Sequence, residues 1–213
     1  MLVKATKIYA ANVRGLVKNL KIINSLNLAE YEVLLLSEIW NIKDFENVKI
    51  NGFELAHWYQ RENRGGGVAI YVKTGMEFTQ INGKINIGIT EAIGINTNGL
   101  NIFCIYRPPS GNKNEFINDM CSLMDNNRGR KVILGGDFNI NNLVENNVLN
   151  DWANTYNLKA KIKGIMRPES GSCLDNFYTN TDGNFWISNT SIADHLSIIA
   201  EIKTENQVIH KNL

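Results

Sequence analysis

This sequence of 213 residues has few cysteines, almost no net charge and no long hydrophobic run. The three cysteines form no C-x-x-C pair and two lie in apolar runs, which predicts buried free thiols in a reducing compartment and argues against a zinc site. The 22 Lys and Arg nearly balance 21 Asp and Glu, so a polyanionic partner would have to be met by local patches. The start, MLVKATKIYA, is interrupted by Lys4 and Lys7, and no stretch reaches membrane-spanning length, so we expect an intracellular chain without signal peptide or membrane partner.

What the sequence does contain is an alternation of short apolar runs with amphipathic stretches, without repeats, which predicts an α/β fold. Helices are expected over 16–27, 113–126 and 143–156. Strands are expected over 5–13, 31–40, 53–59, 67–73, 88–96, 100–106, 131–134, 175–179 and 196–203. About ten strands are too many for a doubly wound sheet and too irregular for a β/α barrel, so two packed sheets flanked by helices fit best.

The domain organisation is expected to be simple. One domain is predicted over residues 1–203, because a chain of this length can bury one substantial core. Residues 204–213 lose periodicity and are predicted to be a tail or the start of a linker.

Four polar residues stand at the ends of expected strands, where α/β folds build their sites. They are Asn12 after KIYAA, Glu38 after VLLLS, Asp137 after VILGG, and Asp175 in LDNFY. An ionised Glu38 next to so apolar a run needs a metal, a cation or several donors to compensate it, unless it turns out to solvent.

The segment VILGGDFN places two glycines before two polar residues. Side chains two apart on a strand share a face, so Asp137 and Asn139 can point at one substrate group. Gly135 and Gly136 permit torsions or close approaches that a Cβ would block. An ordinary turn is the alternative, because Gly, Asp and Asn are the usual turn residues.

Asp194 and His195 precede the apolar strand LSIIAEI, and Asp175 lies in another apolar segment. A carboxylate bonded to one imidazole nitrogen fixes the tautomer and raises the basicity, as a catalytic histidine requires. A surface or capping pair is the alternative. Tyr106 and Arg107 open YRPPSG, where they could contact phosphate or simply form a rigid strand exit.

The chain carries these motifs in a fixed order: N at 12, SE at 37–38, Y at 106, GGDFN at 135–139, S-x-x-D at 172–175 and DH at 194–195. The set resembles that of the endonuclease/exonuclease/phosphatase superfamily and covers nearly the whole chain. The phrases LSEIW, RGGGVAIYV, YRPPSG and LDNFYTN are most similar to the endonuclease domain of LINE-type (non-LTR) retrotransposons. The resemblance implies a four-layered α/β sandwich with two mainly antiparallel sheets.

The resemblance also implies roles for the site residues. Glu38 would ligate Mg²⁺, or Mn²⁺ in its place, with Asn12 and Asp194 close to the metal. Asp175 would orient His195. The remaining assignments are the attacking water and the phosphate for Asp137 and Asn139, the phosphate for Tyr106, and DNA contact for Ser172. Apart from the resemblance, Arg14, Arg107 and Arg167 are expected to contact DNA as basic side chains near the motifs.

Two departures from the family pattern set this chain apart. Arg14 stands where repair enzymes have an aspartate near the metal, which argues against the abasic-repair branch. Ala193 replaces the serine of the usual SDH triplet and removes a hydroxyl donor. Met166 also stands about where related endonucleases often carry a threonine.

Local basic segments predict a double-stranded DNA partner. They are Lys4 to Lys21, Arg128 to Lys131, and Lys159 to Arg167, and they could contact phosphates on both sides of a site or be solvated faces. The resemblance implies a nick with a 3′ hydroxyl that primes reverse transcription in the nucleus, with the reverse transcriptase downstream in the same polyprotein. The alternatives are an abasic-site repair endonuclease, another phosphoesterase of this fold, and a decayed DNA-binding domain without activity.

Overall fold

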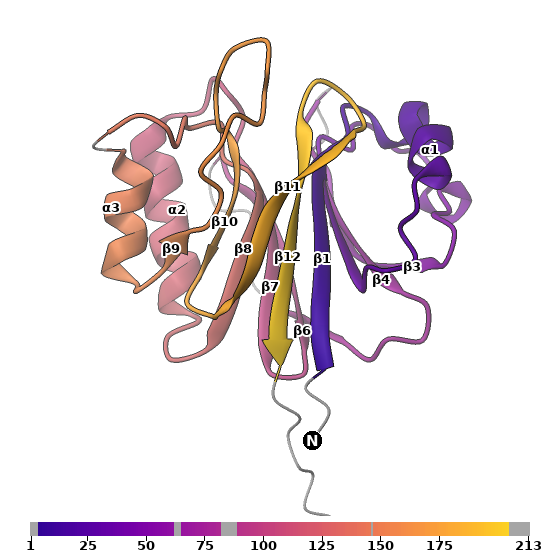
Figure 1. Ribbon diagram of the computed structural model, residues 1–213, viewed down its shortest axis with the longest axis horizontal. Coiled ribbons are helices and arrows are strands. Elements are labelled where there is room, and N and C mark those ends of the chain that lie inside the picture. Colours follow the sequence, from indigo (N-terminus) through magenta and orange to yellow (C-terminus); the bar gives the residue numbers. More distant parts are fainter. Residues whose placement is uncertain (1–3, 62–64, 82–88, 146, 205–213) are drawn as a thin grey trace, which may run out of the picture.

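Apolar residues alternate between the two faces of the central strands, and this alternation produces the layers of the fold. In β1 (Lys4–Asn12), Ile8 and Ala10 face the core between two sheets, whereas Tyr9 and Ala11 face a second core under a helix. The computed structural model, which describes residues 4–61, 65–81, 89–145 and 147–204, repeats this division in the other central strands. Two sheets therefore pack face to face, with helices on their outer faces (Figure 1).

Within the described ranges, each sheet has six strands. In order across the first sheet they are β11 (Gly183–Ser191), β12 (Leu196–Thr204), β1, β2 (Val33–Ser37), β4 (Val68–Lys73) and β3 (Phe53–Tyr59). The second sheet holds β5 (Thr79–Ile81), β6 (Glu91–Thr97), β7 (Leu100–Tyr106), β8 (Lys131–Asp137), β10 (Asp175–Thr179) and β9 (Lys159–Ala160). The predicted two-sheet α/β sandwich is confirmed.

The helices cover the two outer faces. The helix α1 (Leu16–Ser25) packs on the first sheet through Leu16 and Ile23. The second sheet is covered by α2 (Lys113–Asp125) and α3 (Val148–Thr155), while η1 (Phe45–Asn47) is a single 3₁₀ turn. Among the described residues, none of the helices has the length and apolar character needed to cross a membrane.

Strand direction brings distant parts of the chain to one edge. Strand β1 is parallel to β2, and β7 is parallel to β8, while the other pairings among the described strands are antiparallel. The ends of these four strands therefore meet at the edge where β10 and β12 begin. In Figure 1 this edge is at the top, where the segments before β10 and between β11 and β12 project beyond the sheets.

The two glycines of VILGGDFN are required by close packing in β8. A Cβ on Gly135 would lie 2.6 Å from the Phe177 ring, and one on Gly136 would lie 2.0 Å from the carbonyl oxygen of Ile105. Gly136 also has a φ of 142°, which other residues rarely adopt. Glycine is thus the residue that lets β8 lie against β7 and the other sheet just before Asp137.

We expect Gly136→Ala to lower the free energy of unfolding by at least about 2 kcal/mol, because the new methyl group collides with backbone that cannot move aside. Denaturant unfolding followed by circular dichroism measures the loss. Gly129→Ala is the matched control, since Gly129 also has a positive φ but no heavy atom within 4 Å of its Cβ position. Equal losses in the two variants would contradict the packing argument.

The sequence missed three strands and misplaced one helix start. Strands β5 and β9 are only three and two residues long, and β11 is an edge strand with the polar sequence SNTS at its end. The helix expected from residue 143 begins at Val148, because the side chain of Asn147 caps it by accepting a hydrogen bond from the Leu149 N–H. Propensity alone did not reveal this cap.

The remaining expectations concern the thiols and the tail. Cys104 and Cys173 are buried free thiols, as predicted, and Cys121 is free and half-buried. Strand β12 extends to Thr204, and the rest of the predicted tail, residues 205–213, lies outside the described residues.

Candidate active site

Six of the predicted site residues converge on the shared edge of the two sheets. Each comes from a strand end or the residue beside it: Asn12 ends β1, Glu38 follows β2, Tyr106 ends β7, Asp137 ends β8, Asp175 begins β10 and His195 precedes β12. The sheets face each other through β1, β2, β7 and β8, so residues from both sheets meet there. Parallel pairing thus gathers side chains that the sequence separates widely.

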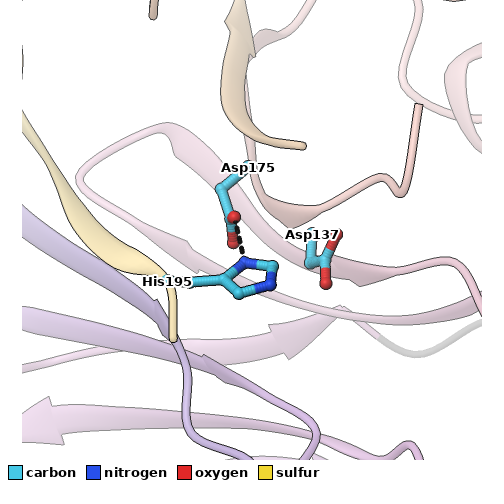
Figure 2. A group of neighbouring side chains, drawn as sticks. All are labelled: Asp137, Asp175 and His195. Carbon is cyan, nitrogen blue, oxygen red and sulfur yellow. Dashed lines mark hydrogen bonds and ion pairs between the residues drawn. The ribbon is translucent and has the colours of Figure 1, made fainter. Parts of the chain in front are cut away.

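The centre of the site is a buried Asp-His pair. The Nδ1 of His195 lies 2.6 Å from the Oδ2 of Asp175, and the two side chains are only 3% exposed (Figure 2). With Nδ1 bonded to Asp175, the other ring nitrogen is directed toward Asp137, as Figure 2 shows. The ligand atoms of Asp137, Asp175 and His195 lie within 4.8 Å of one another, so the three form one chemical unit that could also hold a metal ion.

Burial and mutual charge shift the proton affinities of this unit. Burial raises the pKa of Asp137 to about 7; the charge of Asp175 adds to the shift, while His195 and Asn12 oppose it. Burial likewise raises the pKa of Asp175 against the opposing bond to His195. Burial lowers the pKa of His195, but the bond to Asp175 and the nearby carboxylates outweigh it, so the net pKa is raised. These are the properties of a group that exchanges a proton near neutral pH.

Asn12 links the Asp-His unit to Glu38. Its Nδ2 donates to Glu38 Oε1 and to Asp137 Oδ2, both at 2.8 Å, while its Oδ1 accepts from the Arg14 N–H at 3.2 Å. Glu38 also accepts from Trp40 Nε1 at 3.3 Å. One amide therefore spans two carboxylates that would otherwise repel each other.

This donor set suits a hard divalent cation. Glu38 is half-buried, and its charge acts on Asp175, Glu91 and Tyr106. Carboxylate and amide oxygens are the ligands that Mg²⁺ prefers, and closely spaced carboxylates need a cation to offset their charge. The residues present thus fit the metal implied by the resemblance.

Asn139, a seventh predicted residue, and Tyr106 support the edge of the site. Asn139, with a φ of 47°, donates its Nδ2 to the carbonyl oxygen of Arg107 at 2.7 Å, and its N–H bonds Asp137 Oδ1 at 3.0 Å. Tyr106 lines a cavity of about 390 Å³ together with Glu38, Arg14 and Trp40, a volume that suits a small ligand group. Burial, and then the charges of Glu38 and Asp137, raise the pKa of the Tyr106 hydroxyl, which therefore stays protonated.

Asp194 is held by two arginines. Its Oδ1 lies 3.0 Å from Arg14 Nε, and its Oδ2 lies 2.7 Å from Arg167 Nη2. The arginine side chains are 41% and 29% exposed, so they can still meet a ligand from solvent. The two arginines therefore compensate the charge of Asp194. The neighbouring Ala193 provides no hydroxyl there.

Two residues expected to contact DNA, Arg107 and Ser172, are buried, and so is Met166, which stands where a threonine was expected. Arg107 is only 2% exposed and its guanidinium donates to the backbone carbonyls of Asn139 and Gly111, so it stabilises the loop after β7 and does not reach a ligand. Met166 is fully buried between the sheets. Ser172 is 8% exposed, and its hydroxyl is paired with that of Ser170 at 2.6 Å.

The basic segment before GGDFN lies at the edge of the second sheet opposite the site. Arg128 precedes β8 and Lys131 begins it, and the site lies at the far end of that strand, roughly 20 Å away at about 3.3 Å per residue. Arg128 is instead paired with Asp125 at 2.8 Å. Sequence proximity to GGDFN was a misleading signal.

Sequence reasoning missed two residues at this edge. Trp40 bonds Glu38, and Glu91, the first residue of β6, is a buried acid whose carboxylate accepts from Arg61 and from the Gly67 N–H. A signal for Glu91 was present, because it stands at the start of the apolar run EAIGIN, as Glu38 stands at the end of one.

A scan against family models and a search of curated protein sequences find no match to this chain. Solved structures do match it, and they define the class of fold. An endonuclease/exonuclease/phosphatase family protein from Leptotrichia buccalis superposes with a TM-score of 0.67 at 14% identity, covering 93% of this chain and 99% of that one. The resemblance to this superfamily is therefore confirmed at the level of the fold.

The particular relatives include nucleic-acid enzymes. The endonuclease domain of TRAS1, a telomere-specific non-LTR retrotransposon, has a TM-score of 0.73 at 14% identity and covers 94% of this chain and 99% of its own. The 3′ phosphatase NExo from Neisseria, solved with a product DNA hairpin, has a TM-score of 0.69 at 15% identity, covering 93% and 99%. An AP endonuclease from Archaeoglobus fulgidus has a TM-score of 0.66 at 14% identity, covering 92% and 99%. The predicted likeness to the LINE-type domain thus extends to its fold.

Proposed function

We propose that this protein is a metal-dependent DNA endonuclease that nicks a double-stranded target by hydrolysing a phosphodiester bond. The observation that carries the proposal is the arrangement of a buried Asp-His unit and a half-buried carboxylate at one edge. The Asp137, Asp175 and His195 unit lies beside the Glu38 carboxylate and is joined to it by the Asn12 amide. This combination suits proton transfer next to a bound cation.

The Glu38 carboxylate is the ligand we assign to Mg²⁺, with Mn²⁺ as a substitute, and Asn12 holds that carboxylate through its Nδ2. When bound, the cation would neutralise phosphate charge and stabilise the leaving oxygen. Asp194 lies at the same edge, but its two arginines already compensate its carboxylate, so we assign it to holding them. Glu38, which has a single amide and an indole as donors, is the carboxylate left to meet a metal.

The coupled unit takes the proton of the attacking water. Asp175 fixes the tautomer of His195 through Nδ1, so the other ring nitrogen and the Asp137 carboxylate face the place where water would enter. Loss of that proton lets the water oxygen form a bond to phosphorus while the bond from phosphorus to O3′ breaks. The O3′ takes a proton from solvent and becomes a 3′ hydroxyl, and the 5′ end keeps the phosphate.

Two donors are assigned to the phosphate oxygens. The Tyr106 hydroxyl lines the cavity with Glu38. His195, once it has taken the proton of the water, is a cationic donor at the same edge. Fixed donors of this kind stabilise charge that develops on the phosphate during attack. Asn139 supports them by holding the backbone of Arg107, the residue after Tyr106.

DNA is the proposed substrate because two half-buried arginines, which still reach solvent, lie at the same edge. Arg14 and Arg167 are oriented by Asp194 and can bind backbone phosphates on either side of the scissile bond. The likeness to the TRAS1 domain and the motif set support a role in retrotransposition. The proposed 3′ hydroxyl would then prime a reverse transcriptase located downstream, in the nucleus.

The decisive experiment incubates the protein with supercoiled plasmid in Mg²⁺ or EDTA. We expect open circles with Mg²⁺ and none with EDTA, and we expect the nick to be extended by a DNA polymerase without prior end repair. No nicking under either condition would overturn the proposal and favour a decayed, DNA-binding domain. Faster cleavage of an abasic duplex, or removal of a 3′ phosphate without nicking, would identify the repair or phosphatase alternatives.

We expect the double variant Arg14→Gln, Arg167→Gln to bind duplex DNA on the order of tenfold more weakly, because two phosphate contacts are lost. The slope of log Kd against log salt concentration should fall by about two for the same reason. Fluorescence anisotropy in EDTA measures both. Arg128→Gln is the control, since its 74% exposed side chain lies at the far edge; an equal loss there would contradict the assignment.

A further inference from the structure

The turn that carries Glu38 is held in an unfavourable backbone conformation. Glu38 and Trp40 have φ angles of 54° and 60°, in the left-handed region that non-glycine residues rarely adopt. Such conformations persist only where surrounding contacts enforce them. The position of the Glu38 carboxylate therefore depends on whatever fixes this turn from outside.

Two neighbouring loops fix the turn through the backbone. On one side, the Gly15 N–H donates to the carbonyl oxygen of Glu38 at 2.8 Å, and a Cβ on Gly15 would meet the Trp40 ring at 2.8 Å. On the other side, the Ile39 N–H donates to Gly67 and the Trp40 N–H donates to Gly66, at 3.3 and 2.9 Å. Residues 65–67, the glycine loop, thus supply two acceptors to the residues that directly follow Glu38.

Glu91 in turn fixes the glycine loop. Its carboxylate accepts from the Gly67 N–H with one oxygen and from Arg61 with the other, and its side chain is 3% exposed. A Cβ on Gly66 would lie 2.5 Å from Glu91 Oε1, so the carboxylate is packed directly against the loop. Since Glu91 belongs to β6 and the loop precedes β4, this contact joins the two sheets at the site edge.

From this chain of contacts we infer that Glu91 is a positioning residue for the metal ligand Glu38, acting through the glycine loop and the backbone of Ile39 and Trp40. The inference deepens the proposed function, because it rests on Glu38 binding the cation. Glu91 itself is committed to Arg61 and Gly67 and does not touch the metal position. Its pairing with Arg61 also keeps a second uncompensated charge away from Glu38.

The test measures metal binding and backbone protection without substrate. Calorimetry with Mn²⁺ is expected to show a Kd about tenfold higher for Glu91→Ala, and a smaller increase of about threefold for Glu91→Gln, which keeps an acceptor for the Gly67 N–H. Hydrogen exchange without metal is expected to become faster in the Ile39 and Trp40 amides. The Kd for duplex DNA in EDTA is expected to stay within about twofold, since no phosphate contact is removed.

Asp119→Asn is the matched control, because Asp119 is a buried acid that bonds Thr90, the neighbour of Glu91, and has no bond to the glycine loop. Unchanged Mn²⁺ binding and exchange in both Glu91 variants, or equal changes in Asp119→Asn, would overturn the inference. If Glu91→Ala does not fold, Glu91→Gln decides the question. A wild-type protein that binds no Mn²⁺ would instead remove the metal from the proposed function, and exchange at Ile39 and Trp40 would still decide whether Glu91 holds the turn.

Discussion

His195→Ala is expected to lower the rate of plasmid nicking by about a thousandfold or more, while the Kd for duplex DNA changes little. The imidazole is the link between Asp175 and Asp137, so its removal ends proton transfer within the unit and deletes a donor to the phosphate. The loss should therefore appear in kcat and not in KM. Single-turnover nicking in Mg²⁺, with binding measured in EDTA, separates the two quantities.

Asp175→Asn is the companion variant, because it preserves the shape of the side chain and removes the charge that orients His195. A loss of about a hundredfold is expected from the wrong tautomer and the weaker proton affinity. His57→Ala serves as the control, since His57 lies in β3, bonds the carbonyl oxygen of Gly94 in β6 and takes no part in the site. Nicking at the wild-type rate by His195→Ala would remove this mechanism altogether.

Glu38→Gln is expected to raise the Mg²⁺ concentration for half-maximal nicking by about a hundredfold, because a neutral amide is a far weaker ligand for a hard cation. High Mg²⁺ or Mn²⁺ should restore part of the rate. The titration of nicking against metal concentration distinguishes this from a loss of chemistry, in which the maximal rate alone would fall. Restored activity in excess metal is thus the signature of a ligand.

Glu46→Gln is the control for Glu38, since it makes the same change at an exposed acid in η1. An unchanged metal titration for Glu38→Gln would move the cation to the Asp137, Asp175 and His195 group, whose ligand atoms are close enough to hold one. That result would leave a metal-dependent enzyme but require a different general base.

Arg14 and Asp194 show how a departure in sequence can be compensated in space. From the motif resemblance we expect Arg14 to stand where repair enzymes have an aspartate near the metal, and in the structure it pairs with Asp194. With arginine in place of that aspartate, an abasic-repair site would lose a carboxylate near the metal. The pair instead prepares an exposed cation at the site edge, which is consistent with binding intact duplex DNA.

The parts of the fold that the sequence predicted are those governed by short-range patterns. Short continuous apolar runs located β1, β2, β7 and β8, because each central strand must bury both faces. The start of α3 and the edge strand β11 escaped prediction, since a single cap residue sets the first and polar, half-exposed residues make up the second.

The sequence by itself determined which chemistry-bearing residues stand at strand ends, and so predicted Glu38, Asp137, Asp175 and His195 as site candidates. Local chain geometry is enough for that, because a carboxylate next to a buried strand must lie at its end or be compensated. The need for two glycines at the end of β8 could likewise be predicted from the local sequence.

Only the tertiary structure decided which of these residues meet and which arginines pair with the carboxylates at the site. The parallel pairing of β1 with β2 and β7 with β8 sets the shared edge, and strand pairing depends on contacts between segments far apart in the chain. The pairing of two arginines with Asp194 and the position of Glu91 behind Glu38 also depend on contacts between distant segments. Arg107, in contrast, is buried. Side-chain partners across such distances are fixed by packing of the whole core, which no local pattern specifies.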